Sequence, residues 1–226
     1  WGTNLPPLMF PEGCRAFGSR SSEIGLGQWL SDWRLCDKGF VLLLVLAGSY
    51  TAEIDGISAA GATAVSRRYT AVADAELLLN GPSMPKHWPL PALPAGISPA
   101  LISYVAARLI GVEPLVLAVG LLEAPTFPHL RIESPTLGPS ACVSTGHAMS
   151  LSRVEALWRS GFSMGKKLRQ PLLLSECVPG GTTTAQAVLT GLGLSVADLI
   201  SGSQLKPPVA LKREIVERGL IAAGLD

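Results

Sequence analysis

The sequence predicts an α/β fold with three layers, in which a mostly parallel, Rossmann-like sheet lies between helices on both faces. Three short apolar runs, at residues 40–47, 114–119 and 171–176, have the length and composition of buried strands. Segments with helical patterns separate these runs, and that alternation is typical of βαβ units. The composition allows a large core, because 48% of the 226 residues are hydrophobic and only 15% are charged.

The N-terminal part of the chain does not share this pattern. Residues 1–38 are expected to form an arm or small appendage, rich in Gly and Pro at first. Residues 28–38 then follow with the pattern of a short amphipathic helix that places Trp29 and Trp33 on one side. We expect residues 39–226 to form an α/β nucleotide-binding domain that lacks its C-terminal segment.

The segment between the first two predicted strands combines loops with one clear helix. Its small residues suggest tight loops at first, and residues 70–79 could be a strand or a short helix. The prolines of residues 82–96 predict a loop. Ser98 is expected to cap a helix that has Pro99 in its first position, where the missing N–H is not needed, and that stops at Gly111.

After the second predicted strand, residues 121–147 form a Pro-rich stretch with few periodic features, which we expect to be a loop. A long helix is predicted near residues 150–169. Ser152 and Glu155 have the spacing of a capping box at its start, and Lys167 belongs to a basic group near its negative end.

The last two helices are predicted at residues 183–192, ended by Gly193, and at residues 207–224. The loop at 175–184 therefore lies between the third predicted strand and a helix. Because ligands of parallel sheets collect at the carboxyl ends of the strands, this loop is the first place to look for a site.

Charge and hydropathy exclude several classes of partner. The formal net charge is +1 and the chain has no basic block, so we expect neither nucleic acid nor an anionic membrane surface as a partner. The longest apolar run, residues 40–48, is too short to span a bilayer. No cleavable signal sequence is evident, and we expect a cytoplasmic protein.

The cysteines do not predict a metal or redox site. None of the four forms a C-x-x-C pair, and none has ligand spacing with the three histidines. We expect free thiols in a reducing cytosol, no metal and no cofactor. The cysteines are Cys14, Cys36, Cys142 and Cys177.

The strongest local signal is the stretch SECVPGGTTTAQAVLTGLG at residues 175–193. We call its turn, residues 178–184, the Gly-Thr loop. Glycines let a ligand approach the backbone, a helix N-terminus offers free N–H groups, and three threonines add hydroxyls. This set fits a phosphate, although the loop is not a Walker loop because no Lys follows its second Gly. A tight turn with threonine N-caps explains the same residues without a ligand.

The Gly-Thr loop also resembles a motif of a known enzyme superfamily. ECVPGGTTTAQAVL is similar to the Glu-x-Gly-x-Gly-Asn-Thr-Thr loop of the nicotinate-nucleotide–dimethylbenzimidazole phosphoribosyltransferase superfamily. It is more similar still to the Pro-Gly-Gly-Thr-Thr-Thr loop of the archaeal and cyanobacterial relatives, whose function is less certain. Further stretches resemble superfamily segments in the same order, so that the resemblance covers about residues 28–226: DGISAAGAT at 55–63, AGISPALI at 95–102, STGHAMSLSRVEAL at 144–157 and ALKREIVERGL at 210–220.

The resemblance implies roles for particular residues. Glu176 opens the loop that surrounds the nucleotide and is one candidate for a catalytic base, with Glu53 as another. The implied phosphate- or nucleotide-binding residues are Gly180, Gly181, Thr182, Thr183, Thr184, Gly202 and Lys212. Without the resemblance, Lys212 could be a solvated helix lysine, and Glu176 could be a partner of the helix dipole in its own loop.

The implied activity is transfer of phosphoribosyl from nicotinate mononucleotide to an aromatic azole base such as dimethylbenzimidazole, in cobalamin biosynthesis, by a homodimer. The chain departs from the superfamily loop at Val178 and Gly181. It also lacks the Asp-His pair that follows the first strand in the enzymes. The superfamily's general base is a glutamate that would lie beyond Asp226. We therefore expect that residues 1–226 alone do not turn over nicotinate mononucleotide with dimethylbenzimidazole. We expect the full-length protein at least to bind the nucleotide.

Two alternatives belong to other functional classes. A member of the same fold could bind a nucleotide or phosphate without catalysis, because fold does not fix function. A kinase-like phosphoryl transferase is disfavoured, since the loop has no lysine and no acid pair suited to Mg²⁺ is evident.

Overall fold

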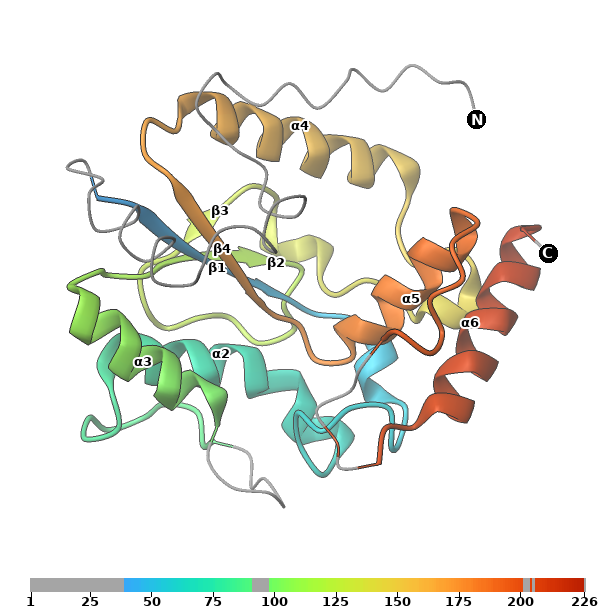
Figure 1. Ribbon diagram of the computed structural model, residues 1–226, viewed down its shortest axis with the longest axis horizontal. Coiled ribbons are helices and arrows are strands. Elements are labelled where there is room, and N and C mark those ends of the chain that lie inside the picture. The colour runs from blue at the N-terminus through green and yellow to red at the C-terminus, as the bar shows by residue number, and fades with distance from the viewer. Residues whose placement is uncertain (1–38, 91–97, 201–203, 205, 226) are drawn as a thin grey trace, which may run out of the picture.

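The computed structural model describes residues 39–90, 98–200, 204 and 206–225 (Figure 1). The predicted N-terminal arm and Gly202 lie outside these residues. The described part is an α/β domain with a parallel four-stranded sheet in the order β3-β2-β1-β4, which confirms the predicted fold class. The strands are β1 (Val41–Ala47), β2 (Leu115–Val119), β3 (Leu130–Arg131) and β4 (Leu172–Cys177).

The three apolar runs are confirmed as strands of one sheet, and β1 lies between β2 and β4. Its side chains alternate between the two faces, and Leu44 and Leu46 pack into the core beneath the sheet. Strand β3 falls within the stretch that was expected to be a loop. Its two residues are exposed, so they have no apolar pattern that could reveal a strand.

Helices α2 (Ala64–Asn80) and α3 (Pro99–Ile110) form one layer on this face (Figure 1). The expectation of a strand or short helix at 70–79 is wrong in extent, because α2 has 17 residues and begins after a loop. Thr63 caps it in a reciprocal capping box with Ser66. Residues 71–79 are almost all apolar and mostly buried, so the helical period that distinguishes a helix from a strand is hidden.

Helix α3 begins and ends as predicted. The Ser98 hydroxyl accepts from the N–H of Ala100, Pro99 occupies the first turn, and Gly111 ends the helix with φ 70°. Ser98 also donates to the carboxylate of Asp74 on α2 at 2.6 Å. The cap therefore joins the two helices, in addition to ending one of them.

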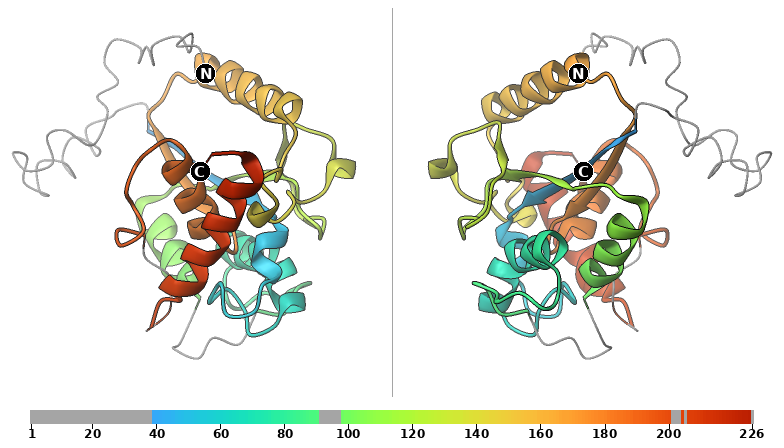
Figure 2. Two further views of the ribbon diagram at one scale, coloured as in Figure 1. Left: turned by 90° about the vertical axis from the view of Figure 1, so that its right-hand side faces the viewer. Right: turned by 90° about the vertical axis from the view of Figure 1, so that its left-hand side faces the viewer.

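Helix α4 (Leu151–Lys167) lies on the opposite side of the sheet from α2 and α3 in all three views (Figures 1 and 2). The predicted capping box at Ser152 is wrong, since the N-cap is Ser150, which accepts from the N–H of Arg153. Arg153 anchors this end through a bidentate ion pair with Glu133 at 2.7 and 2.9 Å. The helix buries none of its residues.

Helices α5 (Gly181–Gly191) and α6 (Val209–Ala223) pack together beyond the carboxyl ends of the strands (Figure 1). Both were predicted, although α5 begins earlier than expected. Helix α6 also packs on the 3-10 turn η3 (Val143–Thr145), where a Cβ at Gly219 would lie 2.5 Å from the carbonyl oxygen of Val143. Two further 3-10 turns are η1 (Tyr50–Glu53) and η2 (Pro135–Leu137). Within the described ranges, no helix has the length and apolar character needed to cross a membrane.

Candidate functional site

The candidate site lies where the loops after β1 and β4 meet. These two strands are neighbours, with Val45 beside Glu176 in the register. The order β3-β2-β1-β4 means that the chain continues from β1 to one side while β4 lies on the other. Ligands of open α/β sheets bind outside the carboxyl ends of the strands at such a switch point.

The Gly-Thr loop packs tightly on the turn that follows β1. Gly180 has φ 71°, and a Cβ there would lie 3.1 Å from the Cα of Ala52 in η1. Any larger residue at this position would combine backbone strain with a steric conflict. The absence of a side chain at Gly180 therefore allows the two loops to pack this closely.

The N-terminus of α5 is not capped by a side chain. Its N-cap is Gly180, and no cap hydrogen bond is formed by a side chain there. The N–H of Gly181 donates to the carbonyl of Val178 at 2.8 Å, and that of Thr183 donates to Gly180 at 3.1 Å. The alternative in which threonines serve as N-caps is therefore wrong.

The three threonines differ in their surroundings. Thr182 is exposed, and its hydroxyl accepts a hydrogen bond from Lys212. Thr183 is 0% exposed, and within the described residues its hydroxyl has no hydrogen-bond partner. The buried hydroxyl of Thr184 has none there either. A buried hydroxyl without a partner costs about 1–3 kcal/mol, and such groups call for an explanation in function.

Lys212 comes from α6 and reaches the start of α5. Its side chain is 2% exposed, and its ammonium donates to the hydroxyl of Thr182 at 2.8 Å. Burial lowers the pKa of this ammonium from its ordinary value. The alternative in which Lys212 is a solvated surface lysine is wrong, whereas its neighbour Arg213 is exposed.

Glu176 lies beside the same loop, near the end of β4. The residue is exposed overall, but its carboxylate lies close to Gly181. A Cβ built on that glycine would be 3.8 Å from Oε2 of Glu176. Partial burial of the carboxyl raises its pKa, and a hydrogen bond from the backbone of Val178 offsets only part of that shift. A raised pKa makes a carboxylate a better proton acceptor near neutral pH.

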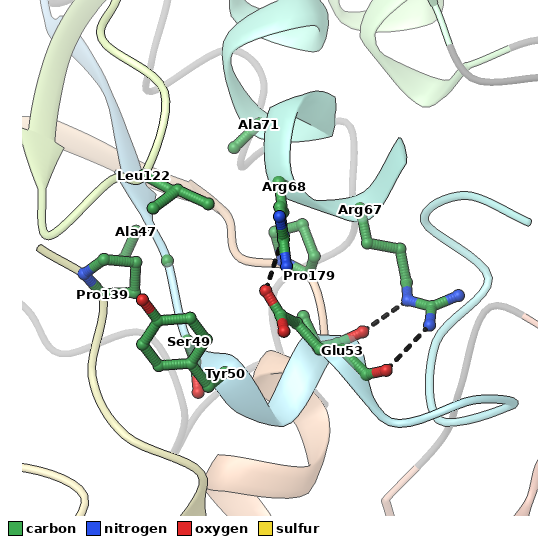
Figure 3. A pocket seen from close by; sticks show the side chains of 12 residues that line it. Ala47, Ser49, Tyr50, Glu53, Arg67, Arg68, Ala71, Leu122, Pro139 and Pro179 are labelled. Atoms are coloured by element: carbon green, nitrogen blue, oxygen red, sulfur yellow. Dashed lines mark hydrogen bonds and ion pairs between the residues drawn. The ribbon is translucent and has the colours of Figure 1, made fainter. Parts of the chain in front are cut away.

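Glu53, the other candidate base, is engaged by a cation. The Nε of Arg68 donates to its Oε1 at 2.7 Å (Figure 3). This ion pair would have to be weakened before Glu53 could accept a proton, and Glu176 carries no such partner cation among the described residues. The structure therefore separates two acids that the sequence left equivalent.

Arg67 was missed by sequence reasoning and organises the loop after β1. Its side chain is 3% exposed and donates to main-chain carbonyls on both sides of that loop (Figure 3). The acceptors are Ala52, Glu53 at 3.3 Å, Ile54 at 3.3 Å and Gly61 at 3.0 Å. Nothing in the sequence marks one arginine of an Arg-Arg pair as buried.

A substitution of Thr183 tests whether its hydroxyl is kept at the expense of stability. We expect Thr183→Val to raise the free energy of unfolding by about 1 kcal/mol, because a buried hydroxyl without a partner is replaced by a methyl group. Thr70→Val is the matched control. That hydroxyl is also buried but shares its one proton between the carbonyl oxygens of Ala60 and Ser66, so the change should destabilise the protein. Urea unfolding measures the stability of both variants. Destabilisation by Thr183→Val would contradict the claim that the Thr183 hydroxyl is buried without a hydrogen-bond partner.

The other chemically reactive groups do not form a metal centre. Within the described ranges, no three His, Cys, Asp or Glu residues lie close enough to hold a metal ion. Cys142 and Cys177 are free thiols. Cys177, the last residue of β4, is partly buried against the core, where desolvation and the nearby carboxylate of Asp74 raise its pKa, so it is not a reactive thiolate.

Comparison with solved structures defines the class of fold. The chain matches the nicotinate-nucleotide–dimethylbenzimidazole phosphoribosyltransferase of Thermus thermophilus with a TM-score of 0.53 and 21% identity, over 81% of this chain and 49% of that one. A structure of CobT from the same organism matches with a TM-score of 0.52 and 20% identity, over 81% and 50%. The fold is that of these phosphoribosyltransferases, which confirms the resemblance predicted from the motifs.

Comparison with curated proteins gives much higher identities. The chain is 66% identical over 220 residues to a UPF0284 protein of Prochlorococcus marinus strain MIT 9313, covering 97% of this chain and 55% of the relative. It is 60% identical over 215 residues to a UPF0284 protein of Parasynechococcus marenigrum strain WH8102, covering 95% and 55%. The chain thus spans about half the length of the curated relatives it matches. No protein-family model matches it.

Proposed function

We propose that this protein is a phosphoribosyltransferase-like enzyme that moves phosphoribosyl from nicotinate mononucleotide to an aromatic azole base such as dimethylbenzimidazole. One observation carries the proposal. The buried ammonium of Lys212 lies 2.8 Å from Thr182 at the first turn of α5, directly beside the glycines of the Gly-Thr loop. The similarity of fold to phosphoribosyltransferases supports it.

The arrangement suits a phosphate monoester. The N-terminus of α5 carries a partial positive charge and main-chain N–H groups, and Lys212 adds a full positive charge next to it. The space beside Gly180 and Gly181 is filled by Ala52 and Val178, so a phosphate would approach the helix start from the side of Thr182 and Lys212. A phosphate held here would fix one end of nicotinate mononucleotide and leave its ribose toward Glu176.

The chemistry then needs few groups. An azole nitrogen attacks C1′ of the ribose while the bond from C1′ to the nicotinate nitrogen breaks, and its electron pair leaves with the nicotinate. That ring nitrogen is cationic in the nucleotide, so departure neutralises it. The azole proton passes to a general base, for which Glu176 is the candidate within residues 39–225. The protein contributes position, positive charge at the phosphate and this base.

Glu176→Gln tests the assignment of the base. We expect a loss of about 10²- to 10⁴-fold in the rate of nicotinate release, with affinity for nicotinate mononucleotide nearly unchanged. The wild-type rate should rise with pH through the raised pKa of Glu176, because only the carboxylate accepts a proton. In the Gln variant this limb of the profile should disappear. A variant that keeps both the rate and the profile would assign the base to another residue.

The raised pKa also predicts a change in stability with pH. The folded state holds the Glu176 proton more tightly than the unfolded state does, so the contribution of this group is fully present below its ordinary pKa and is lost as pH rises through the raised value. Glu176→Gln should remove that dependence. Urea unfolding at several pH values measures it alongside the rate.

A binding protein without catalysis is the competing function, and two assays separate them. Calorimetry on the full-length protein reports nicotinate mononucleotide binding, and chromatography reports nicotinate release with dimethylbenzimidazole present. Binding together with release supports the enzyme. Tight binding without release favours the alternative, and the absence of binding contradicts both.

We also propose a cytoplasmic homodimer that acts in cobalamin biosynthesis. Leu151, Val154, Trp158 and Phe162 repeat along one side of α4, and each is between 44% and 62% exposed. Apolar patches of this kind commonly mark interaction surfaces. Light scattering of the full-length protein at micromolar concentration tests the proposal, and a monomer would contradict it.

A further inference from the structure

The buried face of helix α5 is polar, although a helix that packs inside a domain normally buries an apolar face. Three of its residues are buried, and two of these, Thr183 and Gln186, carry polar side chains. The third is Ala187. Gln186 is only 3% exposed, whereas glutamine in proteins is mostly exposed. A glutamine in this position needs a partner for its amide.

The fold does not supply that partner. Within the described ranges, the buried amide of Gln186 forms no hydrogen bond, and the hydroxyl of Thr183 forms none either. By contrast, the amide of Gln204 donates to the carbonyl of Gly56 at 3.0 Å, although that hydrogen bond is exposed. Burying an amide without a partner is unfavourable, and a methionine of similar length would avoid this cost. Packing therefore does not explain why residue 186 is a glutamine.

Helix geometry places this amide beside the candidate phosphate site. Gln186 follows Thr182 by four residues, so the two side chains lie on the same side of α5, one turn apart. Long helical side chains lean toward the N-terminus, which brings the amide of Gln186 back toward Thr182. Helices α5 and α6 pack side by side (Figures 1 and 2), and the ammonium of Lys212 on α6 lies 2.8 Å from the hydroxyl of Thr182. A phosphate that approaches between Thr182 and Lys212 therefore meets Gln186 next.

The chemistry of an amide suits this position. Its nitrogen carries two N–H donors, and the terminal oxygens of a phosphate monoester are acceptors. Lys212 already places one buried positive charge here. A second buried cation would add a large desolvation cost, whereas a neutral amide adds a hydrogen bond without further charge.

We infer that Gln186 is a further phosphate-binding residue, which donates an N–H of its amide to a terminal phosphate oxygen of the nucleotide. This inference rests on the proposed function and adds a residue to its site. Gln186 also contributes to specificity, because a ligand without a phosphate leaves the buried amide without a partner. The residue therefore distinguishes a nucleotide from the corresponding nucleoside.

Calorimetry on the full-length protein with nicotinate mononucleotide and nicotinate riboside tests the inference. We expect Gln186→Met to weaken binding of the mononucleotide about 10-fold and to leave binding of the riboside unchanged, because the lost hydrogen bond is to the phosphate. Gln186→Glu should weaken binding of the mononucleotide about 100-fold or more, because a carboxylate would then face the phosphate.

The controls separate binding from folding. Gln170→Met, at an exposed glutamine between α4 and β4, is the matched control and should change neither affinity. Circular dichroism verifies that each variant is folded. Gln186→Met should unfold at a urea concentration at least as high as the wild type, since it removes a buried amide that has no partner.

The outcomes distinguish this inference from the proposed function. If mononucleotide binding depends on Lys212, but Gln186→Met changes the two affinities equally or not at all, Gln186 does not contact the phosphate and the proposed function still stands. A loss of stability in Gln186→Met with unchanged affinities would assign the amide a structural role and overturn the inference. If neither inorganic phosphate nor nicotinate mononucleotide binds to the wild type, both proposals are overturned.

Discussion

Lys212→Met is expected to weaken the binding of nicotinate mononucleotide by about 10- to 100-fold while leaving the protein folded. The ammonium is buried and donates to Thr182 at the start of α5. It can therefore contact a phosphate there directly, with little water between the two charges. A hydrogen bond to a charged group contributes about 1.5–3 kcal/mol, which corresponds to this loss of affinity.

The stability of this variant provides a second readout. Methionine has a similar length, and burying a charge is costly, so the free energy of unfolding should stay the same or rise. Because burial lowers the pKa of Lys212, the unfolded state binds more protons between the lowered and the ordinary values, and wild-type stability should rise with pH in that window. The variant should lack this rise.

Lys166→Met, at an exposed lysine on α4, is the control for affinity. Unchanged nucleotide affinity in the Lys212 variant would place the phosphate elsewhere.

Arg67→Met is expected to destabilise the protein by about 3 kcal/mol or more. Its guanidinium is buried and satisfies four main-chain carbonyls around the loop that follows β1. A buried acceptor left without its donor costs about 1–3 kcal/mol, and several would be affected together. Since the same loop packs on Gly180, nucleotide affinity should fall as well.

Asp55→Asn is the control for this prediction. Asp55 lies 3.3 Å from the guanidinium of Arg67, but its side chain is 96% exposed. An ion pair with so exposed a partner contributes little, so the expected loss is within about 0.5 kcal/mol. Urea unfolding compares the two variants. A loss below about 1 kcal/mol for Arg67→Met would mean that the loop is held by other contacts.

The sequence predicted those parts of the fold whose signal is local. Apolar runs of strand length and the Ser98–Pro99 start of α3 depend on a few adjacent residues, and they are confirmed. Helix α2 was mostly missed because it is buried around much of its circumference, so its apolar residues show no helical period. Strand β3 was missed because two exposed residues carry no strand pattern at all.

The features of the candidate site also differ in whether they could be predicted from adjacent residues. The glycines and threonines of the Gly-Thr loop are contiguous, so their position before a helix could be read directly. The contact from Lys212 to Thr182 joins two helices, and the pairing of Glu53 with Arg68 joins a turn to α2. Neither contact follows from spacing along the chain. Burial of Arg67 is likewise a property of the folded loop, which composition cannot reveal.

One measurement tests the central claim, that the Gly-Thr loop and Lys212 bind the phosphate of a nucleotide. Calorimetry on the full-length protein should compare nicotinate mononucleotide with nicotinate riboside, which differs only in lacking the phosphate. The account predicts that the mononucleotide binds at least about 10-fold more tightly, and that Lys212→Met removes most of this difference. Equal affinities for the two ligands, or a difference that survives Lys212→Met, would contradict it.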